Sequence, residues 1–308
     1  MSPKNLRAAF AVLVSLIVTM PAAAGTLGIA GDYNAFIFNN LSSAGGDTEG
    51  RLAVGNNFTA SSYGVGVTLT NSQGARNDLV VGNNMNAIGG WQVFNGNAVW
   101  GNVLTGAPTT PNGATFQGTP INFAAAQAEL QAKSAYWATL PATGTSVFQF
   151  STITLNGSNP GLNVFQVNAN DWQVSSDKQI NIPVGSTAII NIVGTSISFQ
   201  GGLAINGDSS QSNPAENGVI FNFPNATSLN PSNIAILGSV LAPYANLTIT
   251  GGSINGVGIA LNALQQNGGE FHNHPFTGNV PDVPAVPEPA SVALMLFGLA
   301  TFVCGRRR

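Results

Sequence analysis

Cysteine is all but missing from this sequence of 308 residues, in which Cys304 is the only one. Because Cys304 lies close to the C-terminus, the rest of the chain can form no disulfide bond and no thiolate metal site. Histidine is nearly as scarce, with two residues. The stability of the body must therefore come from packing and hydrogen bonds.

Charge is scarce as well, since Asp, Glu, Lys and Arg make up 7% of the residues, against about a quarter in ordinary globular proteins. Five of the nine Lys and Arg lie near the ends, at Lys4, Arg7 and the last three positions, which leaves four in the body. Against them stand 11 Asp and Glu once Glu288 is set aside, so the body has a net charge near −7. This composition argues against a nucleic-acid partner, which requires a basic patch.

The N-terminus carries a targeting pattern. Lys4 and Arg7 precede an uncharged apolar run at 8–20, and Pro21 and three alanines follow it. A charged start, a short apolar core and a small-residue exit are typical of a secretory signal peptide, and a lasting membrane span needs about 20 apolar residues. We predict a signal peptide over residues 1–24 that is cleaved after Ala24.

The C-terminus carries a second targeting pattern. It consists of the triplet Pro287, Glu288 and Pro289, an apolar stretch at 290–304, and the final residues Arg306, Arg307 and Arg308. Because arginines favour the cytoplasmic side of a membrane, we predict a short transmembrane segment at 290–304 that anchors the chain transiently in the inner membrane. The order of these elements resembles the PEP-CTERM sorting signals of Gram-negative bacteria. This resemblance implies recognition by an exosortase-like membrane transpeptidase that cuts near the triplet.

Short motifs repeat between the two ends. The segment 52–58, LAVGNNF, recurs at 79–85 as LVVGNNM and is echoed at 98–103, while GSVLA at 238–242 is echoed by GVGIA at 256–260. An apolar strand closed by a Gly-Asn turn, repeating at this interval, is typical of the rung of a solenoid, in which asparagines of successive turns form ladders. We predict an all-β fold, a right-handed β-helix (β-solenoid). A β-sandwich is the alternative.

One segment departs from the β pattern. Residues 123–139 are rich in alanine, and Phe123, Leu130 and Trp137 recur every seven residues, while Asn122 is suited to cap the start. We predict a single amphipathic α-helix at about 123–139 that flanks the solenoid. The other apolar runs predict strands, among them one continuous strand at 148–155.

The body as a whole resembles the choice-of-anchor A family, an adhesive domain of bacterial surface proteins. The matching segments are 32–36 (DYNAF), 49–55 (EGRLAVG), 140–144 (LPATG), 221–226 (FNFPNA), 238–243 (GSVLAP), 251–256 (GGSING) and 269–276 (GEFHNHPF). This resemblance implies a surface or matrix role and identifies no ligand. We therefore expect a domain over 25–278, a Pro-rich spacer over 279–286 and the sorting tail over 287–308.

A candidate metal site lies near the end of the body. Glu270, His272 and His274 alternate, so in a strand their side chains would share one face within reach of a divalent metal ion. The alternative is that these side chains satisfy backbone groups at the last rung, and this second interpretation needs no cofactor. Calcium is a weaker expectation, because the turn aspartates of the chain match no known calcium motif.

Catalytic signals are missing. We find no nucleophile elbow, phosphate loop or dinucleotide fingerprint, and only Arg51, Arg76, Lys133 and Lys178 supply basic groups in the body. Arg51 is expected to pair with Glu49. The sequence therefore predicts a non-catalytic protein of the cell surface or extracellular matrix, an adhesin that binds exopolysaccharide or other surfaces through uncharged Thr, Ser and Asn side chains. The alternatives are an ice-binding-like protein and a β-helix polysaccharide lyase or hydrolase.

Overall fold

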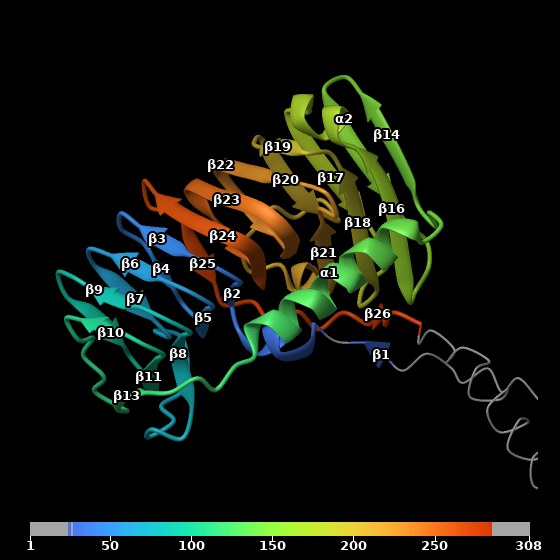
Figure 1. Cartoon of the computed structure of the whole chain (residues 1–308). Helices are drawn as coiled ribbons and strands as arrows, with labels where there is room; N and C mark the ends of the chain where they lie inside the picture. The colour runs from blue at the N-terminus through green and yellow to red at the C-terminus, as the bar shows by residue number, and fades with distance from the viewer. Residues whose placement is uncertain (1–23, 26, 285–308) are drawn as a thin grey trace, which may run out of the picture.

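The computed structural model describes residues 24–25 and 27–284, so the predicted sorting tail at 287–308, its transmembrane segment at 290–304 and all but the last residue of the signal peptide lie outside the described residues. The chain forms a three-sided solenoid whose stacked strands pair in parallel (Figure 1). This parallel stack confirms the predicted β-solenoid over the sandwich, whose sheets are antiparallel. No helix in the described part is long and apolar enough to cross a membrane.

The first side of the solenoid, here called the helix-covered face, is buried on both surfaces along most of its length, but not at its two ends. Its strands stack in the order β13 (Thr115–Gln117), β11 (Asn97–Trp100), β8 (Asn77–Val81), β5 (Leu52–Val54), β2 (Ala35–Ile37), the start of β24 (Gly258–Gln266), the start of β23 (Ser239–Asn255), β21 (Val219–Asn222), β18 (Thr187–Val193) and β16 (Leu162–Asn168). Alternate side chains point into the solenoid core, and those between them point outward beneath a helix.

The second side, here called the polar face, has one buried and one solvent-exposed surface. Its strands are β12 (Leu104–Thr105), β9 (Met85–Ala87), β6 (Phe58–Ala60), β3 (Leu41–Ser43), the end of β24, the middle of β23, the start of β22 (Ser228–Leu237) and β19 (Ser196–Phe199). In β3 and β6 the outer residues are buried and the middle one is exposed. This alternation is typical of a strand with one side in the core.

The third side is less regular. It contains β10 (Trp91–Val93), β7 (Tyr63–Val65), β4 (Asp47–Thr48), β25 (Glu270–His272) and the ends of β23 and β22. A separate end sheet holds β14 (Thr145–Gln149), β15 (Thr152–Asn156), β17 (Asp177–Asn181) and β20 (Gly202–Ile205). Two short 3-10 helices, η1 (Gly28–Asp32) and η2 (Pro214–Gly218), complete the solenoid.

Helix α1 (Phe123–Thr139) covers the first face, at the residues that the alanine-rich pattern predicts. The Asn122 side chain accepts a hydrogen bond from the backbone of Ala125 and caps the start. Leu130 and Trp137 pack on outward residues of the face such as Ile189. Seventeen residues at about 1.5 Å each make a helix of about 25 Å, which spans about five rungs.

The structure contains a second helix, α2 (Ala169–Val174), which was not predicted from the sequence. It takes the place of a polar-face strand in the first rung after α1 and closes that end of the core. Trp172 is fully buried there and contacts the rings of Phe199 and Phe221. The six-residue segment was too short for a helical hydrophobic period to be visible in the sequence.

The spatial order of the rungs differs from their order in the chain. Strand β2 lies in the middle of the stack, between β5 and β24. The chain winds outward from β2 to β13 and returns along the stack through α1. It then winds inward from β16 to β24 and β25, which pair with β2, β3 and β4. The first and last rungs of the chain are therefore neighbours.

The chain ends of the described part meet on the side of α1 (Figure 1). Strand β1 (Ala24–Gly25) pairs antiparallel with β26 (Val280–Pro281), and the indole of Trp137 donates a hydrogen bond to the carbonyl of Pro281. Val280 is 1% exposed. The predicted spacer over 279–286 therefore does not begin as a free segment, because its first residues pack on the body.

The repeated Gly-Asn turn has a steric cause. Gly55, Gly82 and Gly101 stack in successive rungs, and a Cβ on any of them would overlap a carbonyl oxygen of the preceding rung. For Gly82 that oxygen belongs to Gly55. Only glycine permits so close a backbone approach, which explains why the motif recurs.

We expect Gly82→Ala to lower the free energy of unfolding by more than about 2 kcal/mol, because the methyl group would push two rungs apart. Gly31→Ala is the matched control, since a Cβ added at Gly31 would lie 3.5 Å from its nearest neighbour, the Cβ atom of Leu27, which is an ordinary contact. Urea denaturation of both variants measures the difference. Equal stability of the two would contradict this account of the repeat.

Candidate binding face

The polar face presents its outward side chains in columns that run across the rungs. Paired positions in neighbouring strands place them side by side in the order Thr248, Leu264, Ser42, Thr59, Asn86 and Thr105. Ser42 and Thr59 are exposed. The strands lie about 4.8 Å apart, so the column is a regular array of small hydroxyl and amide groups, with one leucine in it.

Two shorter columns flank the central one. On one side Ser196, Ser228, Asn246 and Asn262 are aligned, and on the other Ser232, Thr250 and Gln266. All of these side chains carry uncharged hydroxyl or amide groups, and some of the groups bond to one another, as Asn262 does to Asn246 and Gln266 to Thr250. The face thus offers polar contacts over many rungs.

An asparagine ladder rigidifies the corner beside this face. The side-chain amides donate in sequence from Asn83 to Asn56, Asn56 to Asn39, Asn39 to Asn262 and Asn262 to Asn246, at 2.8–3.1 Å. This confirms the predicted laddering of turn asparagines. Since Asn39 and Asn262 belong to opposite ends of the chain, the ladder also joins its two halves.

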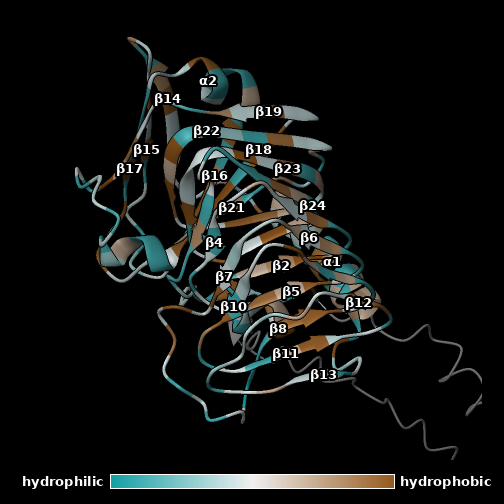
Figure 2. Cartoon of the chain, turned by 90° about the vertical axis from the view of Figure 1, so that its left-hand side faces the viewer, coloured by the Kyte–Doolittle hydropathy of each residue, from teal (hydrophilic) through white to brown (hydrophobic). Residues whose placement is uncertain are grey.

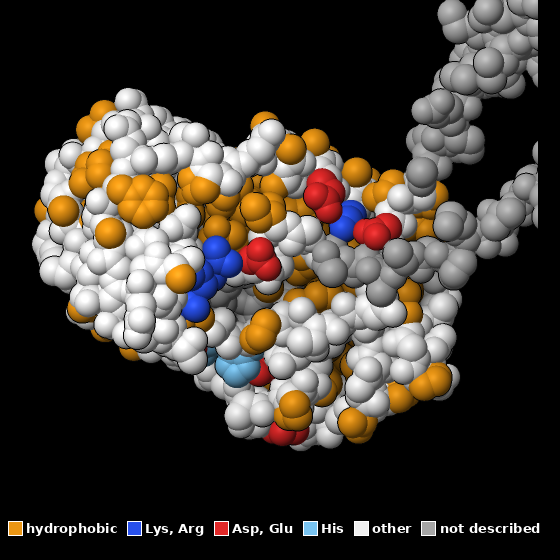
Figure 3. All heavy atoms as spheres, turned by 90° about the horizontal axis from the view of Figure 1, so that it is seen from below, with side chains coloured by type: hydrophobic (Ala, Val, Ile, Leu, Met, Phe, Trp, Pro, Cys, Tyr) orange, Lys and Arg blue, Asp and Glu red, His pale blue; other side chains and the backbone are white. Residues whose placement is uncertain are grey.

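Charge is absent from the columns of the polar face. Figure 2 shows the strands β2, β5, β8 and β11 in the colour of hydrophobic residues, whereas β19 and β22 are pale to hydrophilic. Figure 3 views the molecule from below and shows the charged side chains of that side as a few small groups. A ligand on the polar face would be held by neutral hydrogen bonds and shape, since no ion pair is offered there.

The structure separates the three residues of the predicted metal site. His272 contacts Glu270, with 3.2 Å between Nε2 and Oε2, whereas the Nδ1 atom of His274 lies 2.6 Å from Oε1 of Glu216 in η2. Within the described residues, no three His, Cys, Asp or Glu side chains lie close enough together to hold a metal ion.

Together with Asp47 and Glu49, these residues form a cluster where β25 pairs with β4, here called the acidic junction. Burial, and then the nearby carboxylates of Glu270 and Glu49, raise the pKa of Asp47 to about 6. Burial likewise raises the pKa of Glu216 to about 7, although a hydrogen bond from Asn255 opposes the shift. Both carboxyl groups therefore hold protons in the folded state at a pH where they would lose them in the unfolded chain.

The stability that Asp47 and Glu216 contribute is expected to fall as pH rises from about 4.5 to 7, and this loss should outweigh the opposite effect of His274, whose pKa is lowered by burial. In this window the folded protein binds more protons than the unfolded chain, so deprotonation favours unfolding, and Glu216 accounts for up to about 3 kcal/mol. Thermal melting at several pH values measures the slope, and Glu216→Gln should flatten it. A stability that rises over this interval would contradict the assignment.

The four basic residues of the body are all engaged in structural contacts. Arg51 does not pair with Glu49 as predicted, because its guanidinium hydrogen-bonds the Asp32 carbonyl and the Tyr33 hydroxyl and stacks on the Tyr33 ring. Arg76 pairs with Asp78, Lys133 with Glu129 and Asp282, and Lys178 is buried and donates to the carbonyls of Ser175 and Gln200. None is placed on the polar face.

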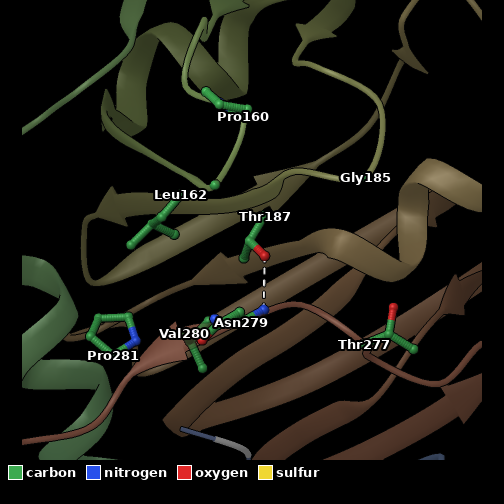
Figure 4. Close-up of a pocket in the computed structure, with 9 residues that line it drawn as sticks. Pro160, Leu162, Gly185, Thr187, Thr277, Asn279, Val280 and Pro281 are labelled. Carbon is green, nitrogen blue, oxygen red and sulfur yellow. Dashed lines mark hydrogen bonds between the residues drawn. The ribbon is translucent and has the colours of Figure 1, made fainter. Parts of the chain in front are cut away.

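A groove lies at the end of the solenoid that carries β16 and β18 (Figure 4). It has a volume of about 430 Å³ and runs between the loop at 160–162 and the segment 277–281. The backbone of Asn279 donates a hydrogen bond to the Thr187 hydroxyl in its wall. Its lining contains no aromatic ring and no charged side chain, so it lacks a stacking platform for a sugar.

The fold and the polar face define a β-solenoid that presents one flat, uncharged surface. The chain belongs to the family described as "Putative Ice-binding-like adhesive domain", which matches residues 26–273. Residues 285–308 match the PEP-CTERM protein-sorting motif. Together they indicate an exported cell-surface protein that is processed by an exosortase-like system. The choice-of-anchor A name is not confirmed, although the adhesive character that it implied agrees with the matched family.

Several solved structures are similar in fold. An ice-binding protein from the Antarctic ascomycete Antarctomyces psychrotrophicus is 15% identical, with a TM-score of 0.37, over 80% of this chain and 97% of that chain. A glycosylated ice-binding protein from an Arctic yeast is 13% identical, with a TM-score of 0.34, over 88% and 99% of the two chains. At this level of similarity, neither says what the present chain binds. No curated protein matches the sequence.

Proposed function

We propose that the protein is a non-catalytic adhesin of the cell surface or extracellular matrix that binds exopolysaccharide through its polar face. The observation that carries this proposal is the central column from Thr248 to Thr105, which repeats small hydroxyl and amide groups at the spacing of the rungs. A neutral polysaccharide chain displays hydroxyl groups over a similar length, so many weak hydrogen bonds can add up along it.

The attachment of the chain favours this use of the polar face. Strand β26 leads into the sorting tail, and it lies on the side of α1, whereas β3, β6 and β9 of the polar face lie on the opposite side (Figure 1). A molecule held by its C-terminus before or after processing would thus turn the polar face away from the membrane. Whether the tail leaves the protein anchored or released, the face stays accessible.

Ice binding is the second candidate, and the distribution of threonines disfavours it. Of the three strand-like Thr-x-Thr pairs in the sequence, Thr248 and Thr250 lie on the polar face, whereas Thr152 and Thr154 belong to the end sheet and the pair at 68–70 lies outside the strands. The face therefore carries no uniform threonine array. Purified protein should produce no thermal hysteresis, and a clear hysteresis gap would favour the ice-binding function.

Deletion of the gene tests the proposed function in the cell. We expect reduced biofilm formation and reduced retention of exopolysaccharide, and complementation with the complete gene should restore both. Complementation with a chain whose Pro287, Glu288 and Pro289 are replaced by alanine should fail, because the protein would not be sorted to the cell surface. A deletion strain with normal biofilm and normal polysaccharide retention would refute the proposal.

A further inference from the structure

Strand β14 has an unprotected outer edge. It pairs with β15 on one side and ends the four-stranded end sheet, and among the described residues no strand pairs with its other side. All five of its residues are exposed, and the strand lies at the outer end of the molecule (Figure 1). Natural proteins protect such edges with Lys, Pro or a bulge, but the segment 145–156 contains no charge and no proline, and its pairing with β15 has no bulge.

The turn that follows β14 displays an aromatic side chain in an unfavourable conformation. Phe150 and Ser151 both have positive φ, 49° and 62°, as a two-residue hairpin turn of the primed kind requires. Such positions favour Asn and Gly, and Phe is rare there. Phe150 is nevertheless 90% exposed, next to Val147 at 49% and Phe148 at 40%. An apolar group held outward at a cost in conformation points to a contact with another surface.

The hairpin also determines which backbone groups face the open edge. Gln149 and Thr152 close the two-residue turn, so they form a hydrogen-bonded pair, and the pairs alternate along the strand. Val147 consequently bonds toward β15, whereas the N–H and C=O groups of Ser146 and Phe148 point to the free side. The open edge thus offers two residues with unpaired donors and acceptors, placed symmetrically about Val147.

From this geometry we propose that β14 is a self-association edge, at which two copies of the chain pair antiparallel about a two-fold axis through Val147. Ser146 of each copy then exchanges hydrogen bonds with Phe148 of the other. The two Val147 residues face each other as a non-hydrogen-bonded pair, with Cα atoms about 4.5 Å apart. The end sheets of both copies join into one continuous sheet.

A second copy is the occupant that the observations favour. Strand β14 contains no charged residue, so pairing two copies brings no like charges together at the edge, although the body has a negative net charge. The free N–H and C=O groups of Ser146 and Phe148 also lie opposite the corresponding groups of an identical antiparallel strand. Most homo-oligomers use such two-fold interfaces. The sorting motif also gathers identical chains at one cell surface, which raises their effective concentration. Since the polar face belongs to other strands, it remains free in the dimer.

A single cysteine tests the pairing in the complete chain. In a Cys304→Ser background, Val147→Cys should give a disulfide-linked dimer upon mild oxidation, because a Cα separation of about 4.5 Å suits a disulfide. Val193→Cys is the matched control, since Val193 is 51% exposed and lies in β18 rather than at the edge. We expect more than about half of the first variant and less than about a tenth of the second to run as a dimer on a non-reducing gel.

A second measurement uses the chain without introduced cysteines. Val147→Lys, which places two like charges at the axis, should weaken dimerisation at least about tenfold in sedimentation equilibrium in detergent, with the circular dichroism of the fold unchanged. The proposal is overturned if Val147→Cys remains monomeric, if Val193→Cys links equally well, or if Val147→Lys leaves the association unchanged. Capture of a different protein by Val147→Cys in place of the dimer would also overturn it.

Discussion

Replacement of Thr59 and Thr248 by lysine is expected to weaken exopolysaccharide binding at least about tenfold, or about 1.4 kcal/mol. Both residues stand in the central column of the polar face. A lysine side chain would project from the flat array, so a polysaccharide chain could no longer contact successive rungs. Replacement by glutamate should have a similar effect, because the loss arises from shape rather than from the sign of the charge.

Calorimetric titration of the purified protein with exopolysaccharide from the producing bacterium measures this effect. Gln92→Lys and Gln92→Glu are the controls, since Gln92 is the middle residue of β10 on the third side of the solenoid and is half-buried, as Thr248 is. Their affinity should stay within about twofold of the unsubstituted protein. If the lysine pair binds better while the glutamate pair binds worse, charge attraction governs the contact and the neutral-face mechanism is wrong.

Trp137→Ala should lower the free energy of unfolding by about 3–5 kcal/mol. The indole is fully buried between α1 and the helix-covered face, and its N–H is the donor that holds the Pro281 carbonyl. Its removal would leave a cavity in the interface and release one attachment of β26. The backbone carbonyl of Trp137 also accepts a hydrogen bond from the buried side chain of Asn191, so a shift of the helix would disturb β18 as well.

Tyr136→Ala provides the comparison on the same helix. Tyr136 is only half-buried at the edge of the same cluster, so less than half of the effect is expected. Chemical denaturation followed by circular dichroism gives both values. A loss of less than about 1 kcal/mol for Trp137→Ala would show that α1 is not required to hold the two sets of rungs together.

Much of the fold could be predicted from local patterns. The repeats at 52–58 and 79–85 pair residue by residue, with Leu52 opposite Leu79 and Phe58 opposite Met85, and the echoed motif near the end pairs Val240 with Gly258. These predictions were correct because a solenoid places equivalent residues of successive rungs side by side. Helix α1 was visible for a related reason, since a single apolar stripe faces the rungs.

The order of the rungs could not be predicted. Nothing in a local pattern says that β2 pairs with both β5 and β24, because the two sets of repeats differ in length and the contact between them is formed by unlike sequences. The acidic junction follows from this hidden contact. His274 meets Glu216, which is far away in sequence, and for that reason the alternation of Glu270, His272 and His274 suggested a common site that the structure does not form.

The hairpin of β14 and β15 was missed for a different reason. The segment 148–155 alternates as one strand, and its turn at Phe150 and Ser151 has neither of the residues, Asn or Gly, that mark such turns. For the polar face, the sequence predicted uncharged Thr, Ser and Asn side chains but not where they lie. Its columns depend on the register of eight neighbouring strand segments, which the sequence does not display.

Mapping of the ligand contact at residue resolution tests the central claim most directly. Fragments of the exopolysaccharide, added to isotope-labelled protein, should shift NMR signals of Ser42, Thr59, Thr248 and their neighbours across β3, β6, β23 and β24. The signals of the groove at 160–162 and 277–281 should stay in place. Shifts confined to that groove or to the acidic junction would contradict the account, because the polar face would then not be the surface that binds.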